Sequence, residues 1–337
     1  AALYPDDMDL MVTRWTALMG LGRSRQVIRE AAGIALHDSI SGAAHYALGR
    51  AYAALGLHDS SAVQIWLSVA RDSSYRSELA VAAYCRGDVE QAIAIQKRLG
   101  NSGYFPGLVG LYEEIGRIEE ALGIVTQIEK GSRDTEQEAR FRVAQLAFLK
   151  RIGRGQDAVS LGRNYLPRAQ TLYGRWVLRR SLVGALIDQR RLAEAREELE
   201  RLKPEDEETG VSDYYDLCFT AELRLAEGRF AEAVDALREA QTICAVFGTP
   251  DIQTRSRLAE AYRLAGMRQE AASVLIDLLK VYGGHAIAHL DLGRVYQELG
   301  RDLDAEREFR AFLRAWAGAD SGRPELLEAR RRLDEPP

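Results

Sequence analysis

Apolar residues recur along most of this chain with the three- and four-residue spacing of a helix. In the segment 288–299 the apolar positions fall at offsets 0, 4, 7, 8 and 11, and the segment 305–316 repeats those offsets. Positions at these offsets share one face of an α-helix. The pattern therefore predicts pairs of antiparallel amphipathic helices, in which neither helix buries its apolar stripe without the neighbouring pair.

A six-residue phrase separates the two helices of each predicted pair and recurs nine times, at intervals of 29 to 38 residues. It begins at Gly22, Gly56, Gly87, Gly116, Gly153, Arg190, Gly228, Gly266 and Gly300, and it usually closes on alanine. A glycine just past a helix takes the left-handed conformation that ends the helix, and acidic residues after it favour the start of the next one. Arginine adopts this conformation at a higher cost, so we expect the turn at Arg190 to have another shape.

Small residues mark a second repeated position, seven residues before the turn. They are Gly49, Ala80, Ala221, Ala259 and Gly293. A minimal side chain at such a position allows two helix backbones to approach each other closely. We therefore expect close contact between helices at these positions.

The combined pattern resembles the tetratricopeptide repeat (TPR) family, whose unit reads W-x2-L-G-x2-Y, then A-x3-F and a proline. The ninth copy matches best and reads His289-x2-Leu292-Gly293-x2-Tyr296, followed by Ala305-x3-Phe309. Histidine replaces the tryptophan in this copy, and Ala317 lies near the expected proline. The second and eighth copies are similar, whereas the first, fifth and sixth keep mainly the turn and the spacing. The resemblance implies an all-α fold, a right-handed α-α superhelix (solenoid) of about nine TPR-like helix-turn-helix repeats.

The resemblance covers the chain from about residue 9 to residue 316 and implies a single solenoid over residues 1–337. Longer connections at 131–138, 203–210 and 247–251 divide it into repeats 1–4 (9–130), repeats 5–6 (139–202) and repeats 7–9 (213–316). The acidic run 205–208 is interpreted as a solvated loop. Pro324 begins a last stretch, 324–334, that we expect to form a capping helix, because a solenoid must cover its final apolar face.

Candidate catalytic and metal-binding patterns are sparse. His285 and His289 have the i, i+4 spacing that can chelate a metal on a helix, but no carboxylate or cysteine completes a set such as HExxH. His289 also stands at the position of the family tryptophan, where packing accounts for it. The Gly-x-Gly turns at 20–22 and 153–155 lack the remaining residues of a phosphate-binding loop. We therefore predict no enzyme activity, no metal and no cofactor.

Composition narrows the class of partner. The 45 basic residues against 50 acidic ones give a formal net charge of −5, and the arginine clusters alternate with acids, so we predict no nucleic-acid binding. No apolar run reaches the length of about 18 residues that a membrane span needs, so we predict no direct membrane insertion. The three cysteines, Cys85, Cys218 and Cys244, lack a CxxC spacing and are expected to be free thiols.

The first residues of the chain bear on its location. It begins with Ala1-Ala2 rather than methionine, so we expect an upstream piece to have been cut. A removed signal or anchor would place the protein in a membrane-tethered or extracytoplasmic location. The sequence does not decide between a cytoplasmic location and a membrane-tethered or extracytoplasmic one.

TPR superhelices usually bind a ligand on the concave surface that the first helix of each repeat forms. By register, the residues that face this groove lie about three, six and ten positions before each turn. They are Tyr46, Arg50, Tyr84, Glu113, Lys150, Arg180, Glu222, Glu260, Arg263 and Arg294. Their mixed charge disfavours a uniform clamp for a terminal carboxylate. The sequence leaves open whether the chain's own cap occupies this groove.

Two classes of function agree with these observations. The first is a non-catalytic interaction scaffold that holds a peptide or protein segment in the groove through aromatic and arginine anchors. The second is the regulatory or sensor portion of a larger protein, such as the effector arm of a transcription activator or a membrane-tethered envelope assembly factor. No motif names the partner or the oligomeric state.

Overall fold

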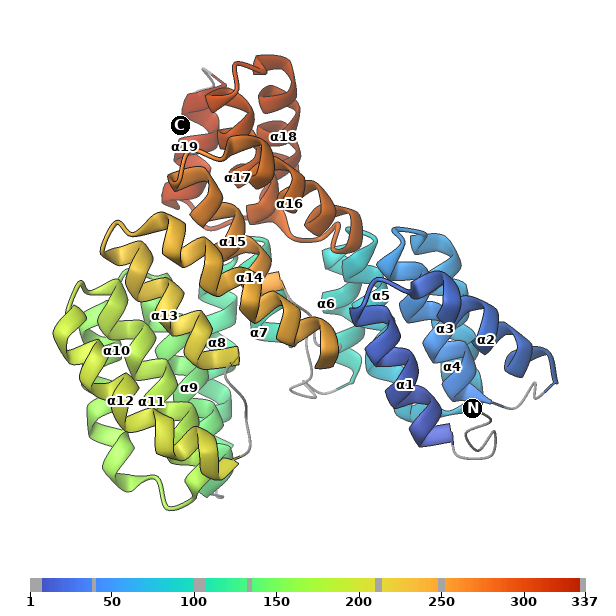
Figure 1. Ribbon diagram of the computed structural model, residues 1–337, viewed down its shortest axis with the longest axis horizontal. Coiled ribbons are helices and arrows are strands. Elements are labelled where there is room, and N and C mark those ends of the chain that lie inside the picture. The colour runs from blue at the N-terminus through green and yellow to red at the C-terminus, as the bar shows by residue number, and fades with distance from the viewer. Residues whose placement is uncertain are drawn as a thin grey trace. The chain divides into compact units, whose positions relative to one another are not determined.

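The computed structural model describes residues 8–37, 41–99, 107–131, 135–209, 214–247 and 252–333 (Figure 1). Every regular element in these ranges is a helix, so the predicted all-α class is confirmed. The α-helices are α1 (Met8–Gly20), α2 (Ser24–His37), α3 (Gly42–Ala54), α4 (His58–Arg71), α5 (Glu78–Cys85), α6 (Val89–Arg98), α7 (Leu108–Glu114), α8 (Ile118–Gly131), α9 (Thr135–Arg151), α10 (Gly155–Tyr165), α11 (Leu172–Asp188), α12 (Leu192–Thr209), α13 (Tyr214–Ala226), α14 (Phe230–Phe247), α15 (Ile252–Leu264), α16 (Arg268–Val281), α17 (Ala286–Glu298), α18 (Asp302–Ala315) and α19 (Pro324–Arg332). Two short 3-10 helices are η1 (Ser73–Ser77) and η2 (Leu166–Arg168).

Odd-numbered helices from α1 to α17 are the first helices of nine successive helix-turn-helix hairpins, and even-numbered helices are the second ones. All eight predicted glycine turns have positive φ, between 70° and 90°. At Gly300 the backbone N–H groups of Gly300 and Arg301 donate to the carbonyls of Gln297 and Tyr296, at 3.0 and 2.9 Å. This pair of bonds satisfies carbonyls that the end of α17 leaves open. The chain is therefore a TPR-like series of helical hairpins.

The turn at Arg190 was expected to differ, and that expectation is wrong. Arg190 has φ 57°, within the left-handed region, and it is the one non-glycine residue with positive φ in the described part of the chain. Its N–H and that of Arg191 donate to Ile187 and Leu186, as at the glycine turns. The hydrogen bonds that close the hairpin therefore hold an ordinary residue in a conformation that costs about 1–2 kcal/mol.

Close approach at the small residues is confirmed in two hairpins. A Cβ added at Gly293 would lie 2.5 Å from the ring of Phe309, and one added at Gly49 would lie 2.6 Å from Ile65. Phe309 is 1% exposed and Ile65 is 2% exposed. The glycine in the first helix thus leaves room for a large apolar side chain of the second helix to lie directly on the backbone.

The helices group into two compact units. Unit 1 comprises Ala1–Arg117, Gln241–Arg263 and Met267–Pro337, and unit 2 comprises Ile118–Ala240 with Leu264–Gly266. Unit 1 therefore joins the N-terminal hairpins to the C-terminal ones, which lie more than a hundred residues further along the chain. The division into three blocks of repeats within one solenoid, with a cap at 324–334, stays a prediction.

Unit 2 contains a core of aliphatic side chains from α9 to α13, including the fully buried Leu146, Leu182, Leu186 and Leu202. Two of the predicted longer connections, 203–210 and 247–251, are in part added helix, because α12 and α14 each extend over 18 residues. The acidic run 205–208 lies in α12, so its interpretation as a loop is wrong. Glutamate has a high helix propensity, which explains why the helix continues through the run.

Candidate peptide-binding face

All ten residues predicted to face a groove lie on first helices, from α3 to α17. We call the surface that they mark the first-helix face, and we describe it separately for each unit. In unit 1 it contains Tyr46, Arg50, Tyr84, Glu113, Glu260, Arg263 and Arg294, and in unit 2 it contains Lys150, Arg180 and Glu222.

Ion pairs connect the first helix of one hairpin to the first helix of the next, or to α19. They are Arg50–Glu78 at 3.9 Å, Lys150–Asp188 at 3.0 Å, Arg263–Glu298 at 2.8 Å and Arg294–Glu328 at 2.9 Å. The side chains are between 19% and 38% exposed, so each pair contributes about 0–1 kcal/mol to stability. Four predicted groove residues are therefore already engaged by the chain, and their charges remain within reach of solvent.

Tyr46, Arg50 and Glu78 lie together in the N-terminal part of unit 1. The Tyr46 ring stacks on Tyr75 with 4.8 Å between ring centroids, and Arg50 Nη1 donates to the Tyr46 hydroxyl at 3.1 Å. Burial raises the pKa of the Glu78 carboxyl, and the charge of Arg50 opposes that rise. Arginine, aromatic ring and carboxylate thus lie together on α3 and its neighbours.

Arg294 occupies the C-terminal part of the same unit. It donates to Asp291 at 2.6 Å and to Glu328 at 2.9 Å, so it links α17 to α19. Its hydrogen bonds lower the pKa of Glu328, whereas burial raises the pKa of Asp291 against the effect of Arg294. The guanidinium is consequently held between two carboxylates, with a side chain that is 28% exposed.

In unit 2 the corresponding contact is between arginine and aromatic rings. The guanidinium carbon of Arg180 lies 4.3 Å from the centre of the Trp176 ring and 3.2 Å from that of Tyr215. Trp176 is 4% exposed and belongs to α11, while Tyr215 belongs to α13. Arg180 therefore joins two first helices through its stacked face. Glu222, on α13, is half-buried.

Tyr84 occupies a different environment from the other predicted residues. It is fully buried, and its ring lies 6.5 Å from that of Tyr282. Burial, together with the nearby charge of Glu114, raises the pKa of Tyr84 well above its ordinary value, so its hydroxyl stays protonated at neutral pH. Glu113 and Glu260 are half-buried, and Glu260 accepts a hydrogen bond from Arg257 at 2.9 Å.

The carboxylates that complete this face were not singled out from the sequence. Glu298 follows Arg263 by 35 residues, and Glu328 follows Arg294 by 34. These intervals are close to one repeat length. An opposite charge one repeat downstream of a groove residue was the signal that would have found them.

The two histidines considered for metal binding point to different partners. His285 lies just before α17, where its Nδ1 is 3.0 Å from the Glu114 carboxylate, whereas Nδ1 of His289 is 2.7 Å from Glu308. No group of three or more metal-binding side chains occurs among the described residues.

The cysteines were expected to be free thiols. Cys85 is buried and Cys218 is half-buried, and both are free thiols. The side chain of Cys244 lies outside the described residues.

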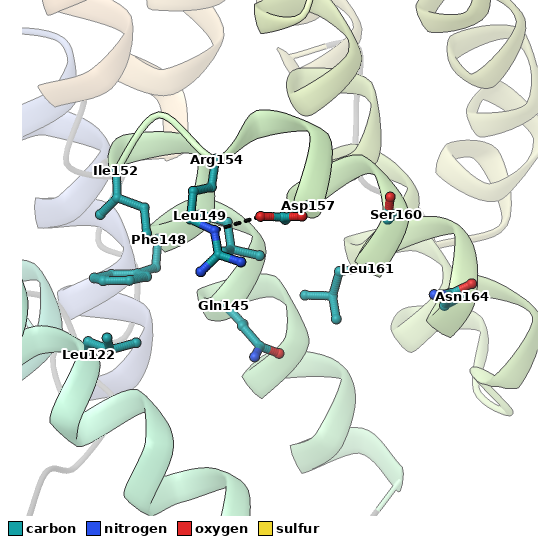
Figure 2. Close-up of a pocket in the computed structure, with 10 residues that line it drawn as sticks. All are labelled: Leu122, Gln145, Phe148, Leu149, Ile152, Arg154, Asp157, Ser160, Leu161 and Asn164. Atoms are coloured by element: carbon teal, nitrogen blue, oxygen red, sulfur yellow. Dashed lines mark hydrogen bonds and ion pairs between the residues drawn. The ribbon is translucent and has the colours of Figure 1, made fainter.

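A shallow hollow of about 340 Å³ lies in unit 2 between α8, α9 and α10 (Figure 2). Leu122, Phe148, Leu149 and Ile152 supply its apolar side. Leu161 and five polar side chains form the rest of the lining, and Figure 2 shows the hydrogen bond from Arg154 to Asp157, which is 2.6 Å long. Among the described residues, no helix is both long and apolar enough to span a bilayer.

Several solved structures are similar to this chain, whereas no protein-family model and no curated sequence matches it. A TPR protein from Parabacteroides merdae is 10% identical over 93% of this chain and 99% of that one, with a TM-score of 0.47. The Cut9–Hcn1 hetero-tetramer of the APC/C matches at 14% identity over 92% of this chain and 62% of the other, with a TM-score of 0.44. A candidate kinesin light chain of Podosopora anserina with nearly identical TPR-like repeats is 22% identical over 56% and 98%, with a TM-score of 0.40.

Proposed function

We propose that this protein is a non-catalytic scaffold whose first-helix face binds an extended peptide or protein segment. The observation that carries the proposal is the set of partly exposed ion pairs that runs from one first helix to the next. Each pair presents a positive and a negative charge within reach of solvent, and a bound segment with its own charges can replace one partner of a pair. The segment favoured by this arrangement carries acidic and basic residues in alternation, with an aromatic or aliphatic anchor near Tyr46.

The mixed charge also argues against two simpler ligands. A strongly basic or strongly acidic segment would meet a like charge at each of these ion pairs, which is unfavourable by electrostatics. A terminal carboxylate would need several neighbouring cations without acids beside them. Recognition is instead expected to depend on the order of charges along the bound segment.

Exchange of the two partners in an ion pair tests this proposal without removing the pair. We expect the exchange Lys150→Asp with Asp188→Lys, two residues whose charges lie 3.0 Å apart, to keep the helical content and thermal stability of the full chain. The exchange reverses the positions of the positive and the negative charge on the first-helix face. The amount of the same partner recovered by affinity co-purification from the native source should therefore fall by about tenfold or more.

The matched control exchanges an ion pair on a second helix. Glu306 and Arg310 of α18 are 2.7 Å apart and exposed, and the variant Glu306→Arg with Arg310→Glu should recover the partner at the wild-type level. Equal recovery of one protein by both exchanged variants would contradict a role for the first-helix face, and so would a loss common to both.

A further inference from the structure

Within unit 1, the connection between α16 and α17 lies against the C-terminal ends of α5 and α7, which are about two hundred residues distant in sequence. The backbone N–H of Gly283 donates to the carbonyl of Cys85, and that of Gly284 donates to the carbonyl of Tyr84, each at 2.9 Å. The last carbonyls of a helix have no partner within the helix. The connection therefore adds two consecutive amide donors at the end of α5, where the Tyr84 carbonyl also accepts from the Gly87 N–H at 2.9 Å.

The segment after α18 makes an equivalent contact with the end of α7. Trp316 Nε1 donates to the carbonyl of Glu114 at 2.8 Å, and the N–H of Asp320 donates to the carbonyl of Gly116 at 3.0 Å. Trp316 is 3% exposed. We call the four hydrogen bonds from residues 283, 284, 316 and 320 the clasp, because each joins a C-terminal segment to the end of an N-terminal helix.

Two glycines make the clasp possible. A Cβ at Gly283 would lie 2.9 Å from the Cys85 carbonyl oxygen, and one at Gly284 would lie 2.6 Å from the Tyr84 carbonyl oxygen. Both obstacles are backbone atoms, which cannot turn aside as a side chain can. The Gly283-Gly284 pair is thus explained by the close approach of two backbones rather than by a special φ angle.

His285 adds an ionisable group to the clasp. Its Nδ1 lies 3.0 Å from both carboxylate oxygens of Glu114, and its Nε2 lies 3.2 Å from the Ser256 hydroxyl oxygen. The Ser256 hydroxyl donates its single proton to the Ile252 carbonyl at 2.8 Å, so its oxygen accepts from Nε2–H. An ionised carboxylate also only accepts, which makes both ring nitrogens donors. Both bonds are therefore satisfied together when His285 is the imidazolium cation.

Acidic groups from two helices interact with His285 and favour that cation. Glu114 belongs to α7, Asp291 to α17, and the buried Tyr84 hydroxyl of α5 stays neutral. The charge of His285 also acts on Asp291, together with those of Arg294 and Glu260. The Glu114 carboxylate thus contacts the ring, the Asp291 carboxylate is near enough to interact with its charge, and Arg294, which also acts on Asp291, is bonded to Asp291 and Glu328.

We propose that the clasp is a proton-sensitive latch, closed most firmly when His285 is protonated and loosened when it is neutral. Loss of a ring proton removes the positive charge that Glu114 faces and one of the two N–H donors, either the one to Ser256 or the one to Glu114. The direction follows from the charge: the latch is strongest at acidic pH, where His285 carries both ring protons, and weakens as the pH rises and the ring loses one of them. The inference concerns only contacts within unit 1 and does not depend on the proposed binding function.

Amide hydrogen exchange of the full chain tests the latch. The protection factors of the Gly283, Gly284 and Asp320 amides, each corrected for the intrinsic rate at that pH, should fall by about tenfold between pH ~5.5 and pH ~8, as expected for loss of one hydrogen bond to a charged group. Amides inside α17 and α18 should keep their protection over this range.

Two variants separate the latch from general stability. His285→Gln carries no charge at either pH, so the protection of the three amides should become independent of pH. His289→Gln is the matched control, because His289 pairs with Glu308 within its own hairpin, and it should keep the pH dependence. Equal protection of the three amides at both pH values in the wild type would overturn the proposal, as would an unchanged pH dependence in His285→Gln.

Discussion

Replacement of Phe309 by alanine is expected to lower the free energy of unfolding of unit 1 by about 3–5 kcal/mol. The Phe309 side chain is 1% exposed and lies on the backbone of Gly293, where an added Cβ would be 2.5 Å from the ring. A helix backbone cannot move into the space that the ring leaves, so most of the cavity should remain. Denaturant unfolding followed by circular dichroism measures the loss.

Leu303 provides the matched control on the same helix. Its side chain is 84% exposed, and Leu303→Ala should change the free energy of unfolding by no more than about 0.5 kcal/mol. A similar loss in both variants would mean that α17 and α18 do not pack through the Gly293–Phe309 contact.

A methyl group at position 284 is expected to open the clasp. In Gly284→Ala the new Cβ would lie 2.6 Å from the Tyr84 carbonyl oxygen and 2.8 Å from the Tyr84 ring. The connection must then move away from α5, so we expect unit 1 to lose about 1–3 kcal/mol of stability and the amides of residues 283 and 320 to exchange faster. Denaturant unfolding and amide exchange at one fixed pH measure the two effects.

Gly318→Ala is the corresponding control, because no atom lies within 4 Å of an added Cβ at that glycine and its φ is not in the left-handed region. It should leave both stability and exchange near wild-type values. If Gly284→Ala and Gly318→Ala behaved alike, the backbone approach at Tyr84 would not be present in solution.

The parts of the fold that the sequence predicted are those set by local chemistry. The glycine turns and the apolar spacing each act within a few residues, so the hairpins were predictable from them. Arg190 shows the limit of this reasoning. Its expected departure came from the intrinsic cost of a left-handed arginine, but the two hydrogen bonds that close the hairpin outweigh that cost.

The clasp was beyond sequence reasoning for a different reason. Three of its four hydrogen bonds join a backbone N–H to a backbone carbonyl, and every residue except proline supplies those groups. Residue type therefore carries little information about them. The Gly283-Gly284 pair was the available signal, but glycines are also expected in any turn. For the first-helix face, the sequence indicated the helices that carry it, while the ion pairs depend on how neighbouring hairpins meet.

The central claim is that partners bind on the first-helix face, and a photo-cross-linking scan tests it most directly. A photoreactive phenylalanine analogue would replace Tyr46 on α3 or Arg263 on α15, and, on second helices, Trp66 on α4 or Leu303 on α18. Trp66 and Leu303 are 62% and 84% exposed, so access does not limit their reaction. We expect one partner segment to be cross-linked from positions 46 and 263 and not from positions 66 and 303. Cross-links from the second-helix positions alone, or equally from all four, would contradict it.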